Sequence, residues 1–316
     1  MFTRAPRALT AALTALTAAA LTFTAGCAGD DGARTTGPAP SGSAAAGYPV
    51  TVGKLTLAAR PEKIVSLSPT ATEMLFAIGA GKQVTAVDQN SNYPPEAPKG
   101  DLSGFQPNAE AIAAKNPDLV VISNDLNKIM DQLAQLKIPV YLAPAAVTLD
   151  DTYRQTTELG TLTGHAAEAE GVVTKMKSDI AQIVTTVPQR SAQPTYYYEL
   201  GPELYSATSR TFVGSLFTMA GLANIADPAD ADGSKGGYPQ LSEEFVVKAN
   251  PDFVFLADTK CCGQSAATVK ARKGWSSVAA VTKDQIVALD DDIASRWGPR
   301  VVDLLRTIVD STARAK

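Results

Sequence analysis

One segment occurs twice in this chain. The first copy reads EAIAAKNPDLVVIS over residues 110–123, and the second reads EFVVKANPDFVFLA over residues 244–257. In each copy Asn-Pro-Asp ends an apolar stretch of helical spacing, because proline cannot continue a helix and disfavours helical backbone in the residue before it. A short apolar strand follows. The common offset of 134 residues is too long for a solenoid repeat, so it predicts two similar α/β lobes in one chain.

The first residues have the features of an export signal. Arg4 and Arg7 form a basic start, and the Ala/Leu/Thr-rich run over residues 8–23 is too short and too weakly apolar for a good transmembrane span. Cys27 follows Ala-Gly, as in the lipobox of bacterial lipoproteins. We therefore predict a lipoprotein signal peptide over residues 1–26 and lipidation of Cys27. The alternative is a freely secreted protein with an unpaired cysteine.

Composition and charge place the rest of the chain outside the membrane. Residues 27–47 are rich in Gly, Ala, Ser, Pro and Thr without apolar periodicity, which predicts a flexible tether. The 28 Lys and Arg and 32 Asp and Glu give a net charge of −4, spread along the chain, so no surface for nucleic acid is expected. We expect a protein anchored to the cell membrane by its lipid and facing the extracytoplasmic side.

The predicted elements follow the same order in both halves. Residues 63–68 and 84–88 read as strands that flank a helix over residues 71–80, and a strand over residues 195–199 begins a similar series in the second half. The predicted fold class is α/β, with two Rossmann-like lobes that have parallel-rich sheets.

The segment between the two halves predicts a rigid connection. We expect the N-terminal lobe over residues 48–148 and the C-terminal lobe over residues 187–316. Residues 149–186 hold apolar side chains at helical spacing and contain no proline. They predict one long helix, or two with a bend near residues 160–164. A helix joins lobes more stiffly than extended strands do.

The signatures of common enzymes are missing from the sequence. It has no Gly-x-Ser-x-Gly elbow, phosphate loop, dinucleotide fingerprint or zinc-ligand cluster. His165 is the single histidine and lies in the connecting segment, where a structural role is expected. We predict a protein that is not an enzyme and has no metal site of its own. Two alternatives remain: a cell-surface redox or hydrolytic enzyme on the same scaffold, and an adhesin-like interaction protein.

Four pieces of sequence carry a family resemblance. They are PEKIVSLSPTATEMLFAIGA over residues 61–80, Tyr93-Pro-Pro, NPDLVV over residues 116–121, and Trp297-Gly-Pro-Arg-Val. The chain from about residue 48 onward resembles the class III solute-binding proteins of ABC importers for vitamin B12 and ferric siderophores. The resemblance implies a monomer without a cofactor, which captures a metal chelate between its lobes. It also implies a partner, an ABC permease dimer with its ATPase subunits.

The resemblance gives the two repeated glutamates a role. In this family one glutamate on each lobe docks onto arginines of the permease, and the matching positions here are Glu110 and Glu244. The alternative is that each carboxylate only stabilises the N-terminus of its helix, which is favourable by a few tenths to about 1 kcal/mol. Both roles are compatible.

The ligand is expected on loops that follow the carboxyl ends of strands, between the lobes. Aromatic side chains suit the broad faces of a chelate, and arginines suit its charge. The residues expected to contact the ligand are Thr70, Tyr93, Phe105 and Asn124 from the first lobe, and Tyr198, Tyr205, Arg210, Tyr238, Asp292, Arg296 and Trp297 from the second.

Several of these residues have an alternative role. Tyr93 and Tyr238 could pack on the prolines that follow them. Period-two alternation places Tyr197 on the opposite face of its strand from Tyr198, so at least one of the two is expected in the core. Arg296 could form ion pairs with the acidic residues 290–292 instead of contacting a ligand.

Cys261 and Cys262 are adjacent in a chain predicted to be exported. An oxidising compartment favours a vicinal disulfide, and two free thiols are the alternative. The ligand class is expected to be a corrinoid, because the Tyr-Pro-Pro loop and the C-terminal segment from Asp292 look closer to the cobalamin binders. A ferric siderophore is the close alternative, and haem is a third.

Overall fold

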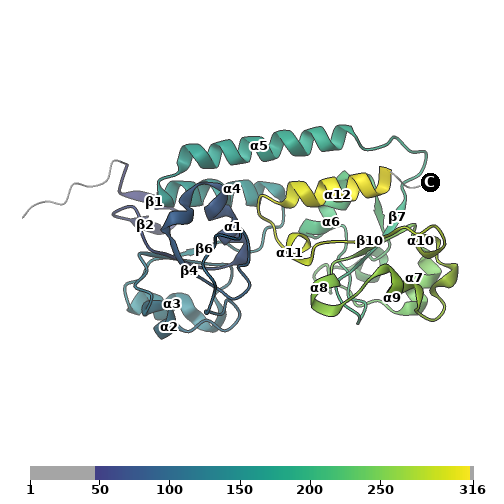
Figure 1. The fold of residues 1–316 in the computed structure, drawn as a ribbon, viewed down its shortest axis with the longest axis horizontal. Helices are drawn as coiled ribbons and strands as arrows, with labels where there is room; N and C mark the ends of the chain where they lie inside the picture. The colour runs from purple at the N-terminus through teal and green to yellow at the C-terminus, as the bar shows by residue number, and fades with distance from the viewer. Residues whose placement is uncertain (1–46, 314–316) are drawn as a thin grey trace, which may run out of the picture. The chain divides into compact units, whose positions relative to one another are not determined.

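Two four-stranded sheets organise residues 47–313, the part of the chain that this computed structural model describes (Figure 1). The first sheet consists of β3 (Ile64–Leu67), β4 (Val84–Val87), β5 (Leu119–Ile122) and β6 (Val140–Leu142). The second consists of β7 (Thr195–Glu199), β8 (Ala223–Asn224), β9 (Phe253–Leu256) and β10 (Ile286–Ala288). The predicted signal peptide, Cys27 and the tether up to residue 46 lie outside the described residues.

The two sheets have the same topology. Their orders are β4-β3-β5-β6 and β8-β7-β9-β10, and every hydrogen-bonded pair in them is parallel. The central pair has the same register in both, because Leu67 lies opposite Ile122 in the first sheet and Glu199 lies opposite Leu256 in the second. The predicted α/β fold, with two lobes that each contain a parallel sheet, is confirmed.

Helices cover both faces of each sheet. In the first lobe these are α1 (Pro69–Ala77), α2 (Ala109–Ala113) and α3 (Ile129–Gln135), with 3-10 turns at Ala80–Gln83 and Leu126–Lys128. The helices in the sequence of the second lobe are α6 (Phe212–Met219), α7 (Glu243–Ala249), α8 (Thr259–Cys262), α9 (Ala266–Lys270), α10 (Ala279–Thr282), α11 (Asp291–Ala294) and α12 (Val301–Ala313), with 3-10 turns at Asp227–Asp230 and Trp275–Ser277. Of these, α8 and α11 follow the carboxyl ends of β9 and β10 and do not cover a face of the sheet. An antiparallel hairpin of β1 (Val50–Val52) and β2 (Leu55–Leu57) precedes the first sheet.

The connecting segment is two helices, α4 (Leu149–Thr163) and α5 (Ala166–Thr185). The chain reverses between them, because the Lys177 ammonium of α5 lies 4.8 Å from the ring centroid of Tyr153 on α4. The expected single helix, or two helices with a bend, is therefore corrected to a helical hairpin, in which α5 alone is the long helix that joins the lobes. The chain turns at Gly164, whose φ of +75° is left-handed, and the Arg60 Nε caps α4 by donating to the Thr163 carbonyl at 2.9 Å. His165 has the expected structural setting, with its Nε2 3.0 Å from the Gln83 Oε1.

Helix α5 belongs to the cores of both lobes. Near its start Ala169 packs with the first-lobe residues Leu159 and Leu162, whereas Met176 and Ile180 pack in the core of the second lobe. One rigid element therefore enters both hydrophobic cores, so the lobes do not swing on a free linker.

The Asn-Pro-Asp repeat performs the same structural task twice. Asn116 and Asn250 have φ values of 50° and 49°, the left-handed conformation that ends a helix. The Asp118 Oδ2 accepts hydrogen bonds from the backbone N–H of Glu62 and of Lys63, both at 2.9 Å. The Asp252 Oδ2 likewise accepts from the backbone N–H of Thr195 at 3.0 Å. In both lobes this aspartate connects the start of the strand that follows it, β5 or β9, to the start of the neighbouring strand, β3 or β7.

Tyr196, Tyr197 and Tyr198 are all buried, which corrects one ligand contact. The alternation is as predicted, with Tyr196 and Tyr198 in one core cluster and Tyr197 in the other. The Tyr198 hydroxyl donates to the Ala294 carbonyl at 3.2 Å. Tyr198 is therefore a core residue. Trp275 is also fully buried.

Candidate functional site

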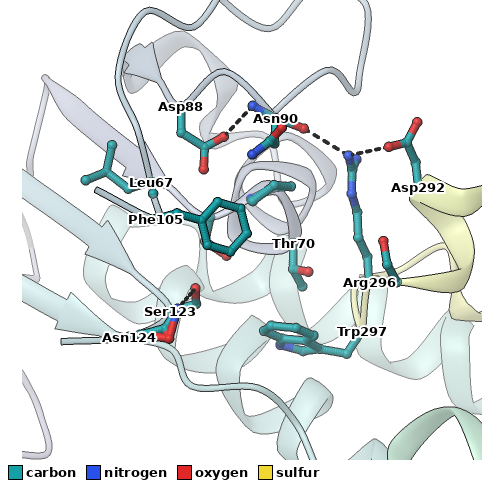
Figure 2. Close-up of a pocket in the computed structure, with 14 residues that line it drawn as sticks. Leu67, Thr70, Asp88, Asn90, Phe105, Ser123, Asn124, Asp292, Arg296 and Trp297 are labelled. Atoms are coloured by element: carbon teal, nitrogen blue, oxygen red, sulfur yellow. Dashed lines mark hydrogen bonds and ion pairs between the residues drawn. The ribbon is translucent and has the colours of Figure 1, made fainter. Parts of the chain in front are cut away.

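A cavity of about 400 Å³ opens at the carboxyl ends of β3 and β5 (Figure 2). The chain leaves β3 toward β4 on one side and returns to β5 on the other, so these two strands flank the topological switch point of the sheet. Open α/β sheets bind ligands at this place. Six of the predicted contact residues line the cavity: Thr70, Phe105, Asn124, Asp292, Arg296 and Trp297.

On the first-lobe side, the cavity is lined by the polar residues Asp88 and Asn90 and by the exposed aromatic ring of Phe105. Asp88, directly after β4, is buried there and accepts a hydrogen bond from the backbone N–H of Asn90 at 3.0 Å. Burial raises the pKa of Asp88 above its ordinary value. A side chain at Gly104 would lie 2.7 Å from the Leu67 carbonyl oxygen, so only glycine allows this close approach. The next residue, Phe105, is 70% exposed at the cavity.

The Arg296 guanidinium lines the cavity but is occupied by other protein groups. Its Nη1 donates to the Glu73 Oε1 at 2.7 Å. Its Nη2 donates to the Asn90 carbonyl at 2.9 Å, to the Asn92 Oδ1 at 2.8 Å and to the Asp292 Oδ1 at 2.9 Å. The ion pair with Asp292 is the alternative expected from the sequence. Arg296 is thus a wall of the cavity and not an uncompensated cation.

Glu73 is the partner that sequence reasoning missed. This buried α1 carboxylate pairs with Arg296 and also accepts from the Arg300 Nε at 2.9 Å. Because no sequence pattern links residues 223 positions apart, the pairing has no local signal. Asp88 and Asn90 were also missed, although an aspartate that follows a buried strand is a recognisable signal for the ligand edge.

Trp297 is held against the first lobe as well. Its indole Nε1 donates to the Gln155 Oε1 at 3.1 Å, and its carbonyl accepts from the Thr152 hydroxyl at 2.8 Å. Both partners are on α4. Residues 292–297 follow the last strand of the second lobe in sequence, yet they complete a cavity of the first.

Four other predicted contacts lie outside this cavity. Tyr93 lines a neighbouring cavity of about 260 Å³, where the Arg300 guanidinium lies 4.0 Å from its ring centroid. Tyr205 and Tyr238 are 46% and 49% exposed on the second lobe. Arg210 pairs with the buried carboxylate of Asp230 at 3.2 Å, so it fastens a 3-10 turn.

The equivalent point of the second lobe is filled by charged side chains. Arg272 donates to both carboxylate oxygens of Glu199, at 2.6 and 2.5 Å, and both partners are largely buried. Asp258 is fully buried beside them, and no group in the described chain donates a hydrogen bond to its carboxylate oxygens. Burial and then the charge of Glu199 raise the pKa of Asp258 to about 7.

The repeated glutamates hold equivalent positions. Glu110 is in the first turn of α2 after the cap residue Asn108, and Glu244 is in the first turn of α7 after the cap residue Ser242. Both side chains are exposed. The arrangement is compatible with helix stabilisation and with an external partner.

The described residues show neither a metal site nor a membrane span. Over residues 47–313 no three His, Cys, Asp or Glu side chains are grouped to hold a metal ion. No described helix is long and apolar enough to cross a membrane.

Sequence and structure comparisons identify relatives. Residues 64–293 match the family model described as periplasmic binding protein. The chain is 32% identical over 257 residues to a cobalamin-binding protein of Halobacterium salinarum, covering 79% of this chain and 69% of the relative. It is 28% identical to YvrC of Bacillus subtilis, an uncharacterized ABC transporter substrate-binding lipoprotein, covering 84% of this chain and 85% of YvrC.

A solved structure has the same fold. The crystal structure of a possible iron-binding, periplasmic solute-binding protein from Staphylococcus epidermidis superposes with a TM-score of 0.70 at 25% identity, covering 81% of this chain and all of that one. The family match spans most of the chain, including both sheets and the connecting helices. The chain therefore belongs to the periplasmic binding protein family.

Proposed function

We propose that this protein captures a corrinoid in the first-lobe cavity and delivers it to an ABC permease. The main observation in favour of a corrinoid is that the hydrogen bonds of the Arg296 guanidinium are already taken up by the protein. Its partners are Glu73, Asn90, Asn92 and Asp292. A strongly anionic chelate needs an uncompensated cation, whereas a corrinoid mainly needs apolar and hydrogen-bonding surface. Phe105 and Trp297 supply the apolar surface at this cavity. The cobalamin-binding relative supports the same ligand.

The ligand extends from the cavity toward the second lobe in this proposal. A cavity of about 400 Å³ is at the small end of ligand sites and holds only part of a large chelate. Tyr205 and Tyr238 are half-exposed aromatics on the second lobe, and they remain our proposed contacts for the opposite face of the ligand. Tyr93, stacked against Arg300, is a proposed contact at the edge.

A ferric siderophore is the second candidate. The similarity to a possible iron-binding protein favours it. Siderophore binding would require an arginine to exchange its protein partner for the ligand. Arg210 is the best placed for this exchange, because its side chain is 51% exposed.

A ligand panel tests the proposal. The chain has two tryptophans, of which Trp275 is fully buried and Trp297 lines the cavity. Titration with cyanocobalamin, cobinamide, the anionic siderophore ferric enterobactin and haemin is expected to quench tryptophan fluorescence with the corrinoids, at a Kd below roughly 1 μM. The Trp297→Phe variant should lose most of the quenching. Binding of ferric enterobactin alone would replace the corrinoid by a siderophore, and the absence of any binding would overturn the proposal.

Delivery is proposed to use Glu110 and Glu244. The two exposed carboxylates occupy the same position of the repeat, which suits a permease dimer that presents arginines to both lobes. The double charge reversal Glu110→Lys and Glu244→Lys should abolish uptake of the ligand by cells and leave its Kd unchanged. Glu170→Lys, at an exposed position of α5, is the matched control and should transport normally. A double variant that still transports the ligand argues against docking through these residues.

We further propose that a lipid on Cys27 holds the protein at the extracytoplasmic face of the membrane as a monomer. The Ala-Gly-Cys motif at the end of the signal sequence and the lipoprotein YvrC support the anchor. Cys27→Ser should release the protein from the membrane fraction into the medium or periplasm. Retention of the variant in the membrane would contradict lipid anchoring.

A further inference from the structure

The disulfide between Cys261 and Cys262 does not staple the fold. The structure contains this bond between neighbouring residues in α8, and both side chains are exposed. A disulfide stabilises a protein mainly by closing a loop in the unfolded chain, and adjacent cysteines close almost none. Stabilisation of the fold therefore does not explain this disulfide, and we look for its role at the protein surface that its two sulfur atoms form.

Helix α8 is fastened to the segment that lines the cavity. The Asp291 carboxylate accepts hydrogen bonds from the backbone N–H of Thr259, Lys260 and Cys261, at 2.9, 2.8 and 3.0 Å. The Lys260 ammonium lies 2.7 Å from the Asp292 Oδ2. Asp292 lines the cavity, so the turn that carries the disulfide is one side chain away from the ligand site.

The repeat places α8 at the ligand edge of the second lobe. Strand β9 is the counterpart of β5, and Asn124, which follows β5, lines the first-lobe cavity. The residues that follow β9 are Ala257, Asp258 and then α8, which lies beside α11 (Figure 1). Because Asp258 is buried next to Glu199 and Arg272, a ligand cannot enter between the strand ends there. The surface of α8, with both cysteines, is exposed at that edge.

We propose that the Cys261–Cys262 disulfide is a further second-lobe contact, besides Tyr205 and Tyr238, for the face of the chelate that lies opposite the first-lobe cavity. This inference rests on the proposed function. Divalent sulfur is apolar and polarisable and packs well on π-systems. A disulfide held by three backbone hydrogen bonds also loses little conformational entropy when a ligand lies on it.

Substitution of both cysteines tests the contact. The Cys261→Ser and Cys262→Ser double variant keeps the size of the side chains but removes the disulfide and its apolar surface. It should bind cyanocobalamin roughly tenfold more weakly, with an unchanged melting temperature. Leu136→Ser is the matched control, because Leu136 is 50% exposed and precedes β6, at the opposite edge of the first sheet. This control should bind with wild-type affinity.

Protection from reduction is the second readout. The full-length protein is treated with tris(2-carboxyethyl)phosphine and iodoacetamide, and peptide mass spectrometry follows alkylation at residues 261 and 262. Saturating cyanocobalamin should slow this alkylation at least about fivefold, because a ligand on the disulfide excludes the phosphine. The same measurements are made with cobinamide, ferric enterobactin and haemin.

Both results are required. If wild-type protein binds a chelate but the double-serine variant binds equally well, or alkylation is not slowed, the disulfide is not a contact and the proposed function stands. If wild-type protein binds none of the four chelates, the proposed function and this inference both fall.

Discussion

The two lobes share a topology but differ at the point where such a fold binds ligands. The strand orders β4-β3-β5-β6 and β8-β7-β9-β10 are equivalent. In each lobe an Asn-Pro-Asp sequence ends a helix and leads into the third strand of the sheet. In the first lobe the ends of the two middle strands border a cavity of about 400 Å³. In the second lobe the same ends carry Glu199 and lead to Asp258, which together with Arg272 fill the space.

The difference lies in a few side chains at matched positions. Leu67, the last residue of β3, corresponds to Glu199, the last residue of β7. Asn124 lies two residues after the end of β5, and Asp258 lies two residues after the end of β9. Topology therefore determines where a site can exist, and the residues at the strand ends determine whether it is open. Four experiments separate the contributions of the two lobes.

Arg272→Met should have the largest effect. It removes the cation from a cluster with two buried carboxyl groups, so the free energy of unfolding is expected to fall by about 4 kcal/mol in urea denaturation. Lys270→Met, which removes the exposed partner of Asp284, is the control and should change it by less than about 1 kcal/mol. A small effect of Arg272→Met would mean that the buried Glu199–Arg272–Asp258 cluster is not essential to the stability of the second lobe.

Glu73→Gln should be the next most damaging. It removes the carboxylate shared by Arg296 and Arg300 and leaves two largely buried cations, for an expected loss of about 3 kcal/mol. The emission of Trp297 should also shift to longer wavelength as the cavity wall loosens. Glu96→Gln, at an exposed neighbouring position, should leave both quantities unchanged. Unaltered Trp297 emission would contradict the role of Glu73 in holding this wall.

The pH dependence of stability should report on the second lobe. The pKa of Asp258 is raised from its ordinary value to about 7, so the folded state binds this proton more tightly than the unfolded state. The resulting stabilisation is complete below about pH 4 and is lost as pH rises through 7. Between pH 5 and pH 8 wild type should lose roughly 2 kcal/mol more than Asp258→Asn. Parallel profiles for the two proteins would show that Asp258 is ionised throughout.

Phe105→Ala should have the smallest effect on stability and a measurable one on binding. The ring is 70% exposed, so the free energy of unfolding should change by less than about 0.5 kcal/mol. Loss of its contact with the chelate should raise the Kd about fivefold. Tyr205→Ala, on the second lobe and outside the cavity, should raise it less. The reverse order would place the main binding surface on the second lobe.

Much of the fold followed from local patterns. The repeat predicted two equivalent lobes, and the prolines after Asn116 and Asn250 marked the helix ends because their effect on the backbone is local. The family of binding proteins also confirms the expectation that the chain is not an enzyme. The sequence predicted at most a bend near Gly164 and not a reversal of the chain, because a glycine within helical spacing does not by itself reveal a left-handed turn.

The site was less predictable from sequence. Residues at strand ends and before the last helix, such as Thr70, Asn124 and Trp297, were found because the ligand edge of a parallel sheet is known in advance. The burial of Tyr198 and the pairing of Arg296 with Glu73 depend on contacts between distant segments. Such contacts leave no trace in spacing or composition.

The passage of α5 through both cores has a mechanical consequence. Ala169 at one end and Ile180 near the other are each packed in a different lobe, and Glu73 ties the lobes a second time through Arg296 and Arg300. Two separate ties oppose any movement that widens the space between the lobes. Thermal motion alone then opens the protein little, so in the proposed delivery a docked permease has to do work on both lobes before the ligand can leave.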